Sequence, residues 1–518
     1  MVLHLSMRCS SMGHTTVTVA LLSSATVHVI LTGFVLQLAK LSLLDSSSRT
    51  FSAPINSYAI RALFLLPFGA SKALANLLAG VLVRVREFKN QWGGTSLCLA
   101  VGWSALLLAP AFLLVSEARA SYAGSWPFAA LATGTVLGVE QGLTWSASLL
   151  RAMDAAGKER AGLASGWIET AGYSAIAAAA VLITTLETKH VKCAFTDVTR
   201  SATCAKVATS CASPSDWTAA CTGECTCHGY AAIAATATAV AAAAGLVLVA
   251  TETLASSRTT KAASPKDDVP LVAMNEAFAA SPNADQGDED ELLTSSTSLS
   301  ALQPSQAFEV SSPSPPTFRA TFVDTSIKDV SRMLCCICGF IANLNSGLAW
   351  GLLLLWLRDH AGLSATQRNY VAASYSFPKG FMQVFAGALS DRLGRRALVV
   401  TGLGASAVAL AVLASLARTN EHVPHDLAWQ SSLAAALLGL GTALAYPVLA
   451  AAVSDRVSNK GAISYAIGTF RFWRDLGYAA GTLVALVADA AGAAVAIGAS
   501  SAVTLLGALA FGVGYHQL

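Results

Sequence analysis

Twelve apolar runs, each long enough to cross a bilayer as a helix, dominate this chain. They lie near residues 16–38, 58–83, 94–116, 126–150, 162–186, 229–252, 331–356, 367–389, 397–417, 428–453, 463–487 and 490–514. Of the 518 residues, 54% are hydrophobic and only 12% are charged, whereas a soluble protein carries roughly twice that charge. The sequence therefore predicts an all-α integral membrane protein with twelve transmembrane helices in a lipid bilayer. The basic residues lie between the runs, so the net charge of +3 does not indicate nucleic-acid binding.

The basic residues also predict the orientation of the helices. If the N-terminus is cytosolic, the short inner loops carry Arg84, Arg86, Lys89, Arg151, Lys158, Arg160, Arg392, Arg395, Arg396, Arg456 and Lys460. The short outer loops then hold only Arg49, Arg119, Arg358, Arg368 and Arg418. Because lysine and arginine concentrate in cytosolic loops, this asymmetry predicts that both termini face the cytosol.

A polar stretch over residues 188–228 lies outside in this topology and is rich in cysteine. It contains Cys193, Cys204, Cys211, Cys221, Cys225 and Cys227. Six cysteines in so short an outer loop favour disulfide bonds, which need an oxidising compartment. The alternative is a metal-binding tract around Cys225-Thr-Cys227-His228, but structural zinc sites usually space their cysteines more widely.

A second polar stretch, residues 254–330, divides six helices from six and predicts a disordered cytosolic linker. Within it, Asp288-Glu-Asp-Glu-Leu292-Leu293 resembles an acidic dileucine sorting signal, the kind that clathrin adaptors bind. The alternative is a solvated acidic run that ends in two leucines. With the cysteine-rich loop, the signal favours an endosomal, lysosomal or vacuolar membrane, and the plasma membrane is the alternative.

The two halves of the chain repeat each other. Lys72 precedes Gly80 by eight residues, just as Lys379 precedes Gly387. In the same way Gly172-Tyr173 matches Gly477-Tyr478, and Asp154 and Asp455 occupy corresponding inner loops. The repeat predicts two six-helix bundles, residues 1–253 and 331–518, with a substrate site between them near the middle of the bilayer.

A compact charged turn, Gly387-Ala-Leu-Ser-Asp391-Arg392-Leu-Gly394-Arg395-Arg396, separates two apolar runs of the second half. Gly387 allows a close helix approach and Gly394 permits the turn. This stretch resembles the signature loop of the major facilitator superfamily, and the resemblance extends over nearly the whole chain apart from the linker and the cysteine-rich loop. Gly142-Leu-Thr-Trp145, Gly172-Tyr173 and the segment from Arg471 to Tyr478 further resemble a branch of prokaryotic-type exporters.

The resemblance implies gating roles for the signature loop. Asp391 is expected to contact the cytosolic end of helix five near Gly162, and Arg395 or Arg396 to pair with Asp455. The N-terminal copy departs from the family pattern, because Arg84 stands where the family has an acidic residue.

Ionisable residues within the apolar runs are the candidate functional residues, since a charge inside the membrane is costly unless it is paired or hydrated. Lys72 and Lys379 are expected on opposite walls of one cavity. Glu140 and Glu169 are candidate proton carriers, with Tyr173 on the same face as Glu169. The alternative is that each glutamate only neutralises a nearby lysine or arginine.

Helix eleven carries Arg471, Arg474, Asp475 and Tyr478, which share one broad face. Arg471 and Asp475 can neutralise each other, which leaves Arg474 to meet Glu169 or an anionic substrate. The bases outnumber the acids in this set, so a small organic anion is the expected substrate class.

Together these features predict a secondary active transporter of a small molecule that works by alternating access and is coupled to protons. A transport-inactive sensor or receptor and a structural membrane protein are the alternatives. No arrangement of a nucleophile and a base is visible, so we expect neither an enzyme nor a cofactor or metal.

Overall fold

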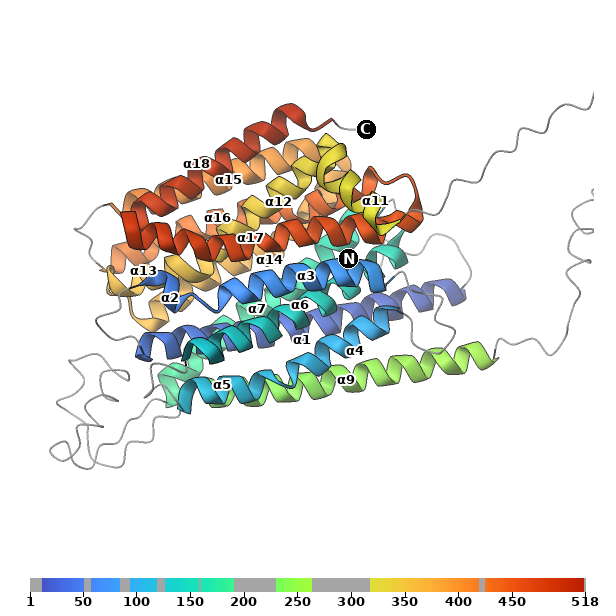
Figure 1. Ribbon diagram of the computed structural model, residues 1–518, viewed down its shortest axis with the longest axis horizontal. Helices are drawn as coiled ribbons and strands as arrows, with labels where there is room; N and C mark the ends of the chain where they lie inside the picture. Colours follow the sequence, from blue (N-terminus) through green and yellow to red (C-terminus); the bar gives the residue numbers. More distant parts are fainter. Residues whose placement is uncertain are drawn as a thin grey trace, which may run out of the picture. The chain divides into compact units, whose positions relative to one another are not determined.

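The computed structural model describes residues 12–50, 57–83, 94–118, 126–157, 160–190, 230–262, 317–418 and 424–516, and these ranges are helical apart from short turns (Figure 1). The first half contains α1 (Met12–Thr50), α2 (Tyr58–Arg61), α3 (Leu65–Leu82), α4 (Gly94–Leu106), α5 (Ala109–Ala118), α6 (Trp126–Ala156), α7 (Ala161–His190) and α9 (Tyr230–Ala262). The second half contains α11 (Phe318–Val323), η4 (Asp324–Lys328), α12 (Val330–Leu348), η5 (Ala349–Leu353), α13 (Leu354–Asp359), α14 (Ala365–Leu393), α15 (Arg395–Leu416), α16 (Pro424–Asp455), η6 (Lys460–Ala462), α17 (Ile463–Ala491) and α18 (Ala493–Gly514).

The prediction of an all-helical, multi-span membrane protein is confirmed, and each predicted apolar run corresponds to one helix or to consecutive helices. The second run, for example, is divided into α2 and α3 by a turn at Ala62–Phe64, and the third is divided into α4 and α5. The two halves, up to Thr253 and from Pro316, form one compact unit. Leu254–Pro315 form a separate unit, of which the structure describes only the end of α9.

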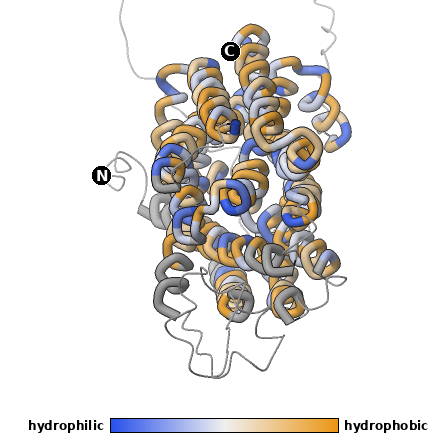
Figure 2. Tube along the Cα trace, turned by 90° about the vertical axis from the view of Figure 1, so that its left-hand side faces the viewer, coloured by the Kyte–Doolittle hydropathy of each residue, from blue (hydrophilic) through white to orange (hydrophobic). Residues whose placement is uncertain are grey.

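Hydropathy alone selects eight of the described helical segments as long and apolar enough to cross a membrane. The long helices that it does not select are α6, α7, α14 and α17. These four carry most of the buried charges, among them Glu140, Glu169, Lys379 and Asp475. Their polarity is tolerable because they face other helices rather than lipid. Seen along the bundle, hydrophilic positions accordingly recur among the inner helices (Figure 2).

The two halves meet along two helix pairs, α14 against α7 and α17 against α3 (Figure 1). Both contacts depend on glycine. A side-chain carbon at Gly80 would lie 2.6 Å from the carbonyl oxygen of Ser464 and 2.9 Å from Cα of Gly468. One at Gly387 would overlap the carbonyl oxygen of Gly162. Small residues thus let helices of opposite halves approach to backbone contact, as is usual in membrane proteins.

The linker prediction is wrong at both of its ends, because the last part of α9, up to Ala262, lies within residues 254–330, and so do α11 and η4. Phe318 and Phe322 are one turn apart and pack against Tyr465 and Phe472 of α17, with ring centroids 5.7 and 6.2 Å apart. The side chain of Thr317 caps α11. These aromatic contacts supply the burial that stabilises so short a helix.

Two predicted features lie outside the described residues. They are the cysteine-rich loop, with Cys193, Cys204, Cys211, Cys221, Cys225 and Cys227, and the sorting motif, with Asp288, Leu292 and Leu293. The cysteines that the structure does describe, Cys98, Cys335, Cys336 and Cys338, are buried and free.

The glycine contact between α14 and α7 predicts a stability difference between two glycine substitutions. Gly387→Val should destabilise the protein by about 1–3 kcal/mol, because the new side chain overlaps the backbone at Gly162. Gly404→Val is the matched control, since a side-chain carbon at Gly404 meets nothing within 4 Å. Melting temperatures of the purified variants in detergent measure the difference. Equal values for the two variants would contradict the close packing of α14 on α7.

Candidate substrate site between the two halves

Asp475 of α17 is the centre of a buried polar network that joins the two halves. Its carboxylate accepts hydrogen bonds from Arg474 Nε at 2.8 Å and Nη2 at 3.1 Å. The side-chain amides of Asn76 on α3 and Asn343 on α12 also donate to it. Lys72 Nζ on α3 lies 3.4 Å away. Asp475 is completely buried, so these five nitrogen atoms of four side chains replace the water that would otherwise solvate its charge.

The expected pairing of Arg471 with Asp475 is therefore wrong. Asp475 instead pairs with its neighbour Arg474 and with Lys72 of the other half. Arg471 Nε donates to the side-chain oxygen of Asn76 at 3.3 Å. Helical spacing allowed the Arg471–Asp475 pair, but the partners across the interface decide which arginine turns toward the acid.

Glu169 of α7 faces both arginines of α17. Its Oε1 lies 3.6 Å from Arg471 Nη1 and 3.6 Å from Arg474 Nη1. This arrangement agrees with the expectation that Arg474 meets Glu169, and it makes Glu169 a neutralising group between the halves. Arg471 Nη1 nevertheless has no hydrogen-bond partner among the residues that the structure describes.

Lys379 of α14 is fully buried in a pocket of hydroxyl groups and aromatic rings. Its Nζ donates to Ser346 Oγ and to the Tyr375 hydroxyl, both at 3.0 Å. It also lies 4.3 Å from the ring centroid of Tyr173 and 4.8 Å from that of Tyr446. Within the described ranges, no carboxylate lies within ion-pair distance of this ammonium group.

A third buried lysine, Lys40 of α1, was missed by the sequence reasoning. It is buried, and its Nζ lies 4.3 Å from the ring centroid of Phe68, 5.3 Å from that of Tyr478 and 5.8 Å from that of Trp350. The first apolar run was placed at residues 16–38, just short of this lysine, whereas α1 continues to Thr50. Leu41, Leu43 and Leu44, which extend the apolar stretch past Ala39, were the available signal.

Glu140 of α6 is almost fully buried and accepts a hydrogen bond from Thr32 Oγ1 at 2.7 Å. Among the described residues no base lies within ion-pair distance of it. Glu140 thus differs from Glu169 and Asp475, which both face arginine.

The signature loop has the geometry that the resemblance implied. Gly394, at a φ of +87°, forms the turn between α14 and α15. Arg395 pairs with Asp391 and donates from Nε to Asp455 Oδ2 at 2.9 Å. Asp391 in turn lies against Gly162 at the start of α7, where an added side-chain carbon would be 2.9 Å from Oδ1.

The remaining predicted gating residues lie outside this contact. Arg392 and Arg396 are exposed, so Arg395 and not Arg396 pairs with Asp455. Asp154 is exposed near the end of α6. The end of the bundle that contains Gly387–Arg396 is called the signature-loop end below.

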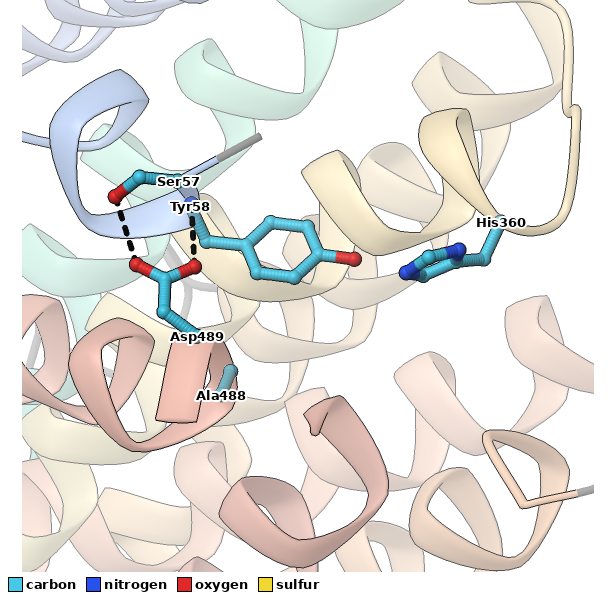
Figure 3. A pocket seen from close by; sticks show the side chains of 5 residues that line it. All are labelled: Ser57, Tyr58, His360, Ala488 and Asp489. Carbon is cyan, nitrogen blue, oxygen red and sulfur yellow. Dashed lines mark hydrogen bonds between the residues drawn. The ribbon is translucent and has the colours of Figure 1, made fainter. Parts of the chain in front are cut away.

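A separate set of contacts joins the halves at the opposite end of the bundle (Figure 3). Asp489 of α17 accepts hydrogen bonds from Ser57 Oγ at 2.7 Å and from the backbone amides of Tyr58 and Ala59 at 2.7 and 3.2 Å. Arg61 forms a two-bond ion pair with Asp359.

These opposite-end contacts border a pocket of about 400 Å³ lined by Ser57, Tyr58, His360, Ala488 and Asp489 (Figure 3). The side chain of Tyr58 extends across it toward His360. The halves are therefore tied together at both ends of the bundle.

Comparison with known proteins identifies the fold. Residues 335–516 match the Major Facilitator Superfamily in sequence. The structure of the proton:xylose symporter XylE has a TM-score of 0.56 at 12% identity, covering 97% of each chain. The human organic anion transporter MFSD10 has a TM-score of 0.52 at 16% identity, covering 94% of this chain and 99% of that one. The nucleoside transporter NupG has a TM-score of 0.53 at 12% identity, covering 96% of this chain and 100% of that one.

A search of curated protein sequences finds no match. The chain therefore has the major facilitator fold over nearly its full length, and its second half also matches that superfamily in sequence. The three solved structures with this fold are described as membrane transporters. None of these matches identifies a particular branch of the superfamily.

The different surroundings of the buried carboxylates predict different costs of removing their charge. Asp475→Asn should destabilise the protein by about 3 kcal/mol, because Arg474 and Lys72 lose the charge that balances them. Glu140→Gln should cost about 1 kcal/mol or less, since its partner is the neutral hydroxyl of Thr32. Thermal unfolding in detergent compares the two variants. A larger cost for Glu140→Gln would show that the charge network is wrongly assigned.

Proposed function

We propose that this protein is a secondary active transporter that moves a small solute by alternating access. The observation that carries the proposal is that a separate polar contact ties opposite halves together at each end of the bundle, with a network of buried charges between the two ends. At the signature-loop end Asp391 of α14 lies against Gly162 of α7. At the opposite end Asp489 and Asp359 hold α2.

Such contacts suit a molecule that opens at one end at a time. Opening the signature-loop end separates Asp391 from α7, whereas opening the opposite end breaks the Arg61–Asp359 pair and frees α2 from Asp489. The network around Asp475 lies between the ends and would be exposed to each side in turn.

A small organic anion is the substrate class that the charges favour. Between the two ends of the bundle, the described buried bases are Lys40, Lys72, Lys379, Arg471 and Arg474, and the described buried acids are Glu140, Glu169 and Asp475. Arg471 Nη1 also points an unused donor at this region. MFSD10, which shares the fold, is described as an organic anion transporter.

Glu140 is the better candidate for proton coupling. Glu169 faces two arginines, whereas among the described residues no base lies within ion-pair distance of Glu140 to balance a charge there. A carboxyl group that can be neutral in the membrane and is linked to α1 through Thr32 is suited to carry a proton.

One sequence feature favours a second candidate function. The N-terminal copy of the signature loop has Arg84 in place of an acidic residue, which favours a transport-inactive sensor as the second candidate function.

The cysteine-rich loop and the acidic dileucine motif support an endomembrane or plasma-membrane location with sorting by clathrin adaptors.

Reconstitution in liposomes with a library of solutes and an imposed pH gradient tests the proposal. We expect one solute to accumulate with the gradient, and Glu140→Gln to abolish that accumulation while solute exchange without a gradient continues. Glu169→Gln is the matched control and should slow both processes, because it disturbs the arginines of α17. Absence of flux, combined with thermal stabilisation by one solute, would favour the sensor.

The contacts at the two ends predict opposite conformational shifts. Asp391→Asn should loosen the signature-loop end and slow turnover without preventing folding, whereas Asp489→Asn should loosen the opposite end. Each lost contact is worth about 1 kcal/mol, or about a fivefold change in the ratio of the two states.

Hydrogen exchange of the backbone amides at the C-terminal end of α14 and in α2 measures these shifts. Asp324→Asn is the control, since its partner Lys328 is an exposed residue on the same element. Normal turnover and unchanged exchange in Asp391→Asn would refute the gating role.

A further inference from the structure

The two buried lysines that the repeat relates, Lys72 and Lys379, contact matching tyrosines, but only Lys72 is paired with a carboxylate in the described part of the chain. Lys72 Nζ lies 4.9 Å from the ring centroid of Tyr478 and 3.4 Å from Asp475. Lys379 Nζ lies 4.3 Å from the ring centroid of Tyr173, which is the repeat counterpart of Tyr478. The symmetry of the halves thus extends to the contact between lysine and tyrosine across the interface, on α3 and α17 in one case and on α14 and α7 in the other.

The carboxylate of this arrangement is present on one side only. The register that aligns Tyr173 with Tyr478 aligns Thr170 with Asp475. The Thr170 hydroxyl accepts a hydrogen bond from the backbone amide of Val384 at 3.1 Å, so it stands at the contact between α7 and α14. Lys379 therefore lacks the acid that its counterpart has, and the neighbouring Glu169 is engaged with the arginines of α17.

Lys40 is the second buried lysine with no carboxylate within ion-pair distance in the described part of the chain. The rings around it come from both halves, Phe68 from α3 and Tyr478 and Trp350 from the second half. Trp350 also contacts Tyr375, which hydrogen-bonds to Lys379, with ring centroids 6.1 Å apart. The two lysines thus stand on either side of one continuous aromatic contact.

The charge count agrees with two missing negative charges. Among the described residues between the two ends of the bundle, five buried bases stand with three buried acids, a difference of two. A buried ammonium group without a counter-ion is costly, and ring faces offset only part of that cost.

We propose that Lys379 and Lys40 each bind one carboxylate of a dicarboxylate substrate. The proposal deepens the proposed function and rests on it. In this arrangement one carboxylate of the substrate takes the place beside Lys379 that Asp475 takes beside Lys72. The chain between the carboxylates lies along Trp350 and Tyr375. A compact dianion such as inorganic phosphate would reach one lysine at a time and bind more weakly.

Binding to the purified full-length protein in detergent tests the proposal. Succinate, glutarate and adipate serve as dicarboxylate probes, with hexanoate as the monocarboxylate and inorganic phosphate as the compact dianion. We expect at least one dicarboxylate to raise the melting temperature more than hexanoate or phosphate does. Lys379→Met and Lys40→Met should each weaken its binding about 30-fold or more. Lys328→Met, which changes an exposed lysine, should have no effect.

A gain of carboxylate gives an independent readout. Thr170→Asp should supply the missing acid to Lys379 and abolish dicarboxylate binding. Thr170→Asn, whose side chain has nearly the shape of aspartate but no charge, should retain dicarboxylate binding. Both lysine variants should fold, because replacing an uncompensated buried charge by methionine removes a desolvation cost. If Lys379→Met fails to fold, Lys379→Arg is measured in its place. This variant keeps the positive charge and should retain part of the affinity for the dicarboxylate.

The outcomes separate this proposal from the proposed function. If liposomes move a neutral solute and Lys379→Met leaves that flux unchanged, transport stands and the lysine assignment is refuted. If a dicarboxylate binds through both lysines but does not cross the membrane under any imposed gradient, the lysine assignment stands and the proposed transport function is refuted. Unchanged dicarboxylate affinity in either methionine variant, or in Thr170→Asp, overturns the proposal, as does tighter binding of phosphate.

Discussion

The absence of water from the bilayer interior is the constraint on which this structure depends, and Asp475 shows how it is met. A carboxylate there must find its partners among other helices, and it does so on α3, α12 and its own helix. This requirement brings the charged helices to the interface of the halves and leaves the more apolar ones toward lipid. Glycines at the crossing points then follow, because the polar groups can meet only if the backbones approach closely.

Ion pairs in such an interior hold the halves together without fixing one arrangement. Glu169 lies 3.6 Å from each of two guanidinium groups, so it can balance one while the other turns to a different partner. The contacts at the ends are more local, since Asp489 grips a few backbone amides and Asp391 lies against one glycine. In the proposed alternating-access cycle, a few hydrogen bonds at either end would be exchanged while the charged centre keeps its balance.

Much of the fold could be predicted from the sequence, because helix length and apolar composition are local properties. The signature loop was also predictable, since Asp391, Arg395 and Asp455 meet as the resemblance implied. Pairings in the centre were not, because amides such as Asn76 and Asn343 carry no charge signal and yet orient Asp475. Lys40 was missed for a different reason: α1 continues beyond its most apolar stretch. The short helix α11 depends on contacts with α17, which a polar, proline-rich segment does not reveal.

The departures from the repeat are more informative than the repeat itself. A perfectly duplicated interface would give each lysine its own acid, and every charge would then be satisfied without a ligand. Here the position of Asp475 is occupied in the first half by Thr170, next to Glu169, whose own counterpart is Arg474. Because of these two differences, Glu169 of the first half faces Arg474 of the second half. Among the described residues, Lys379 is left with aromatic rings and hydroxyl groups as its partners. An unsatisfied basic group in the centre would give an anionic substrate a reason to bind there, because the substrate would supply the missing counter-charge.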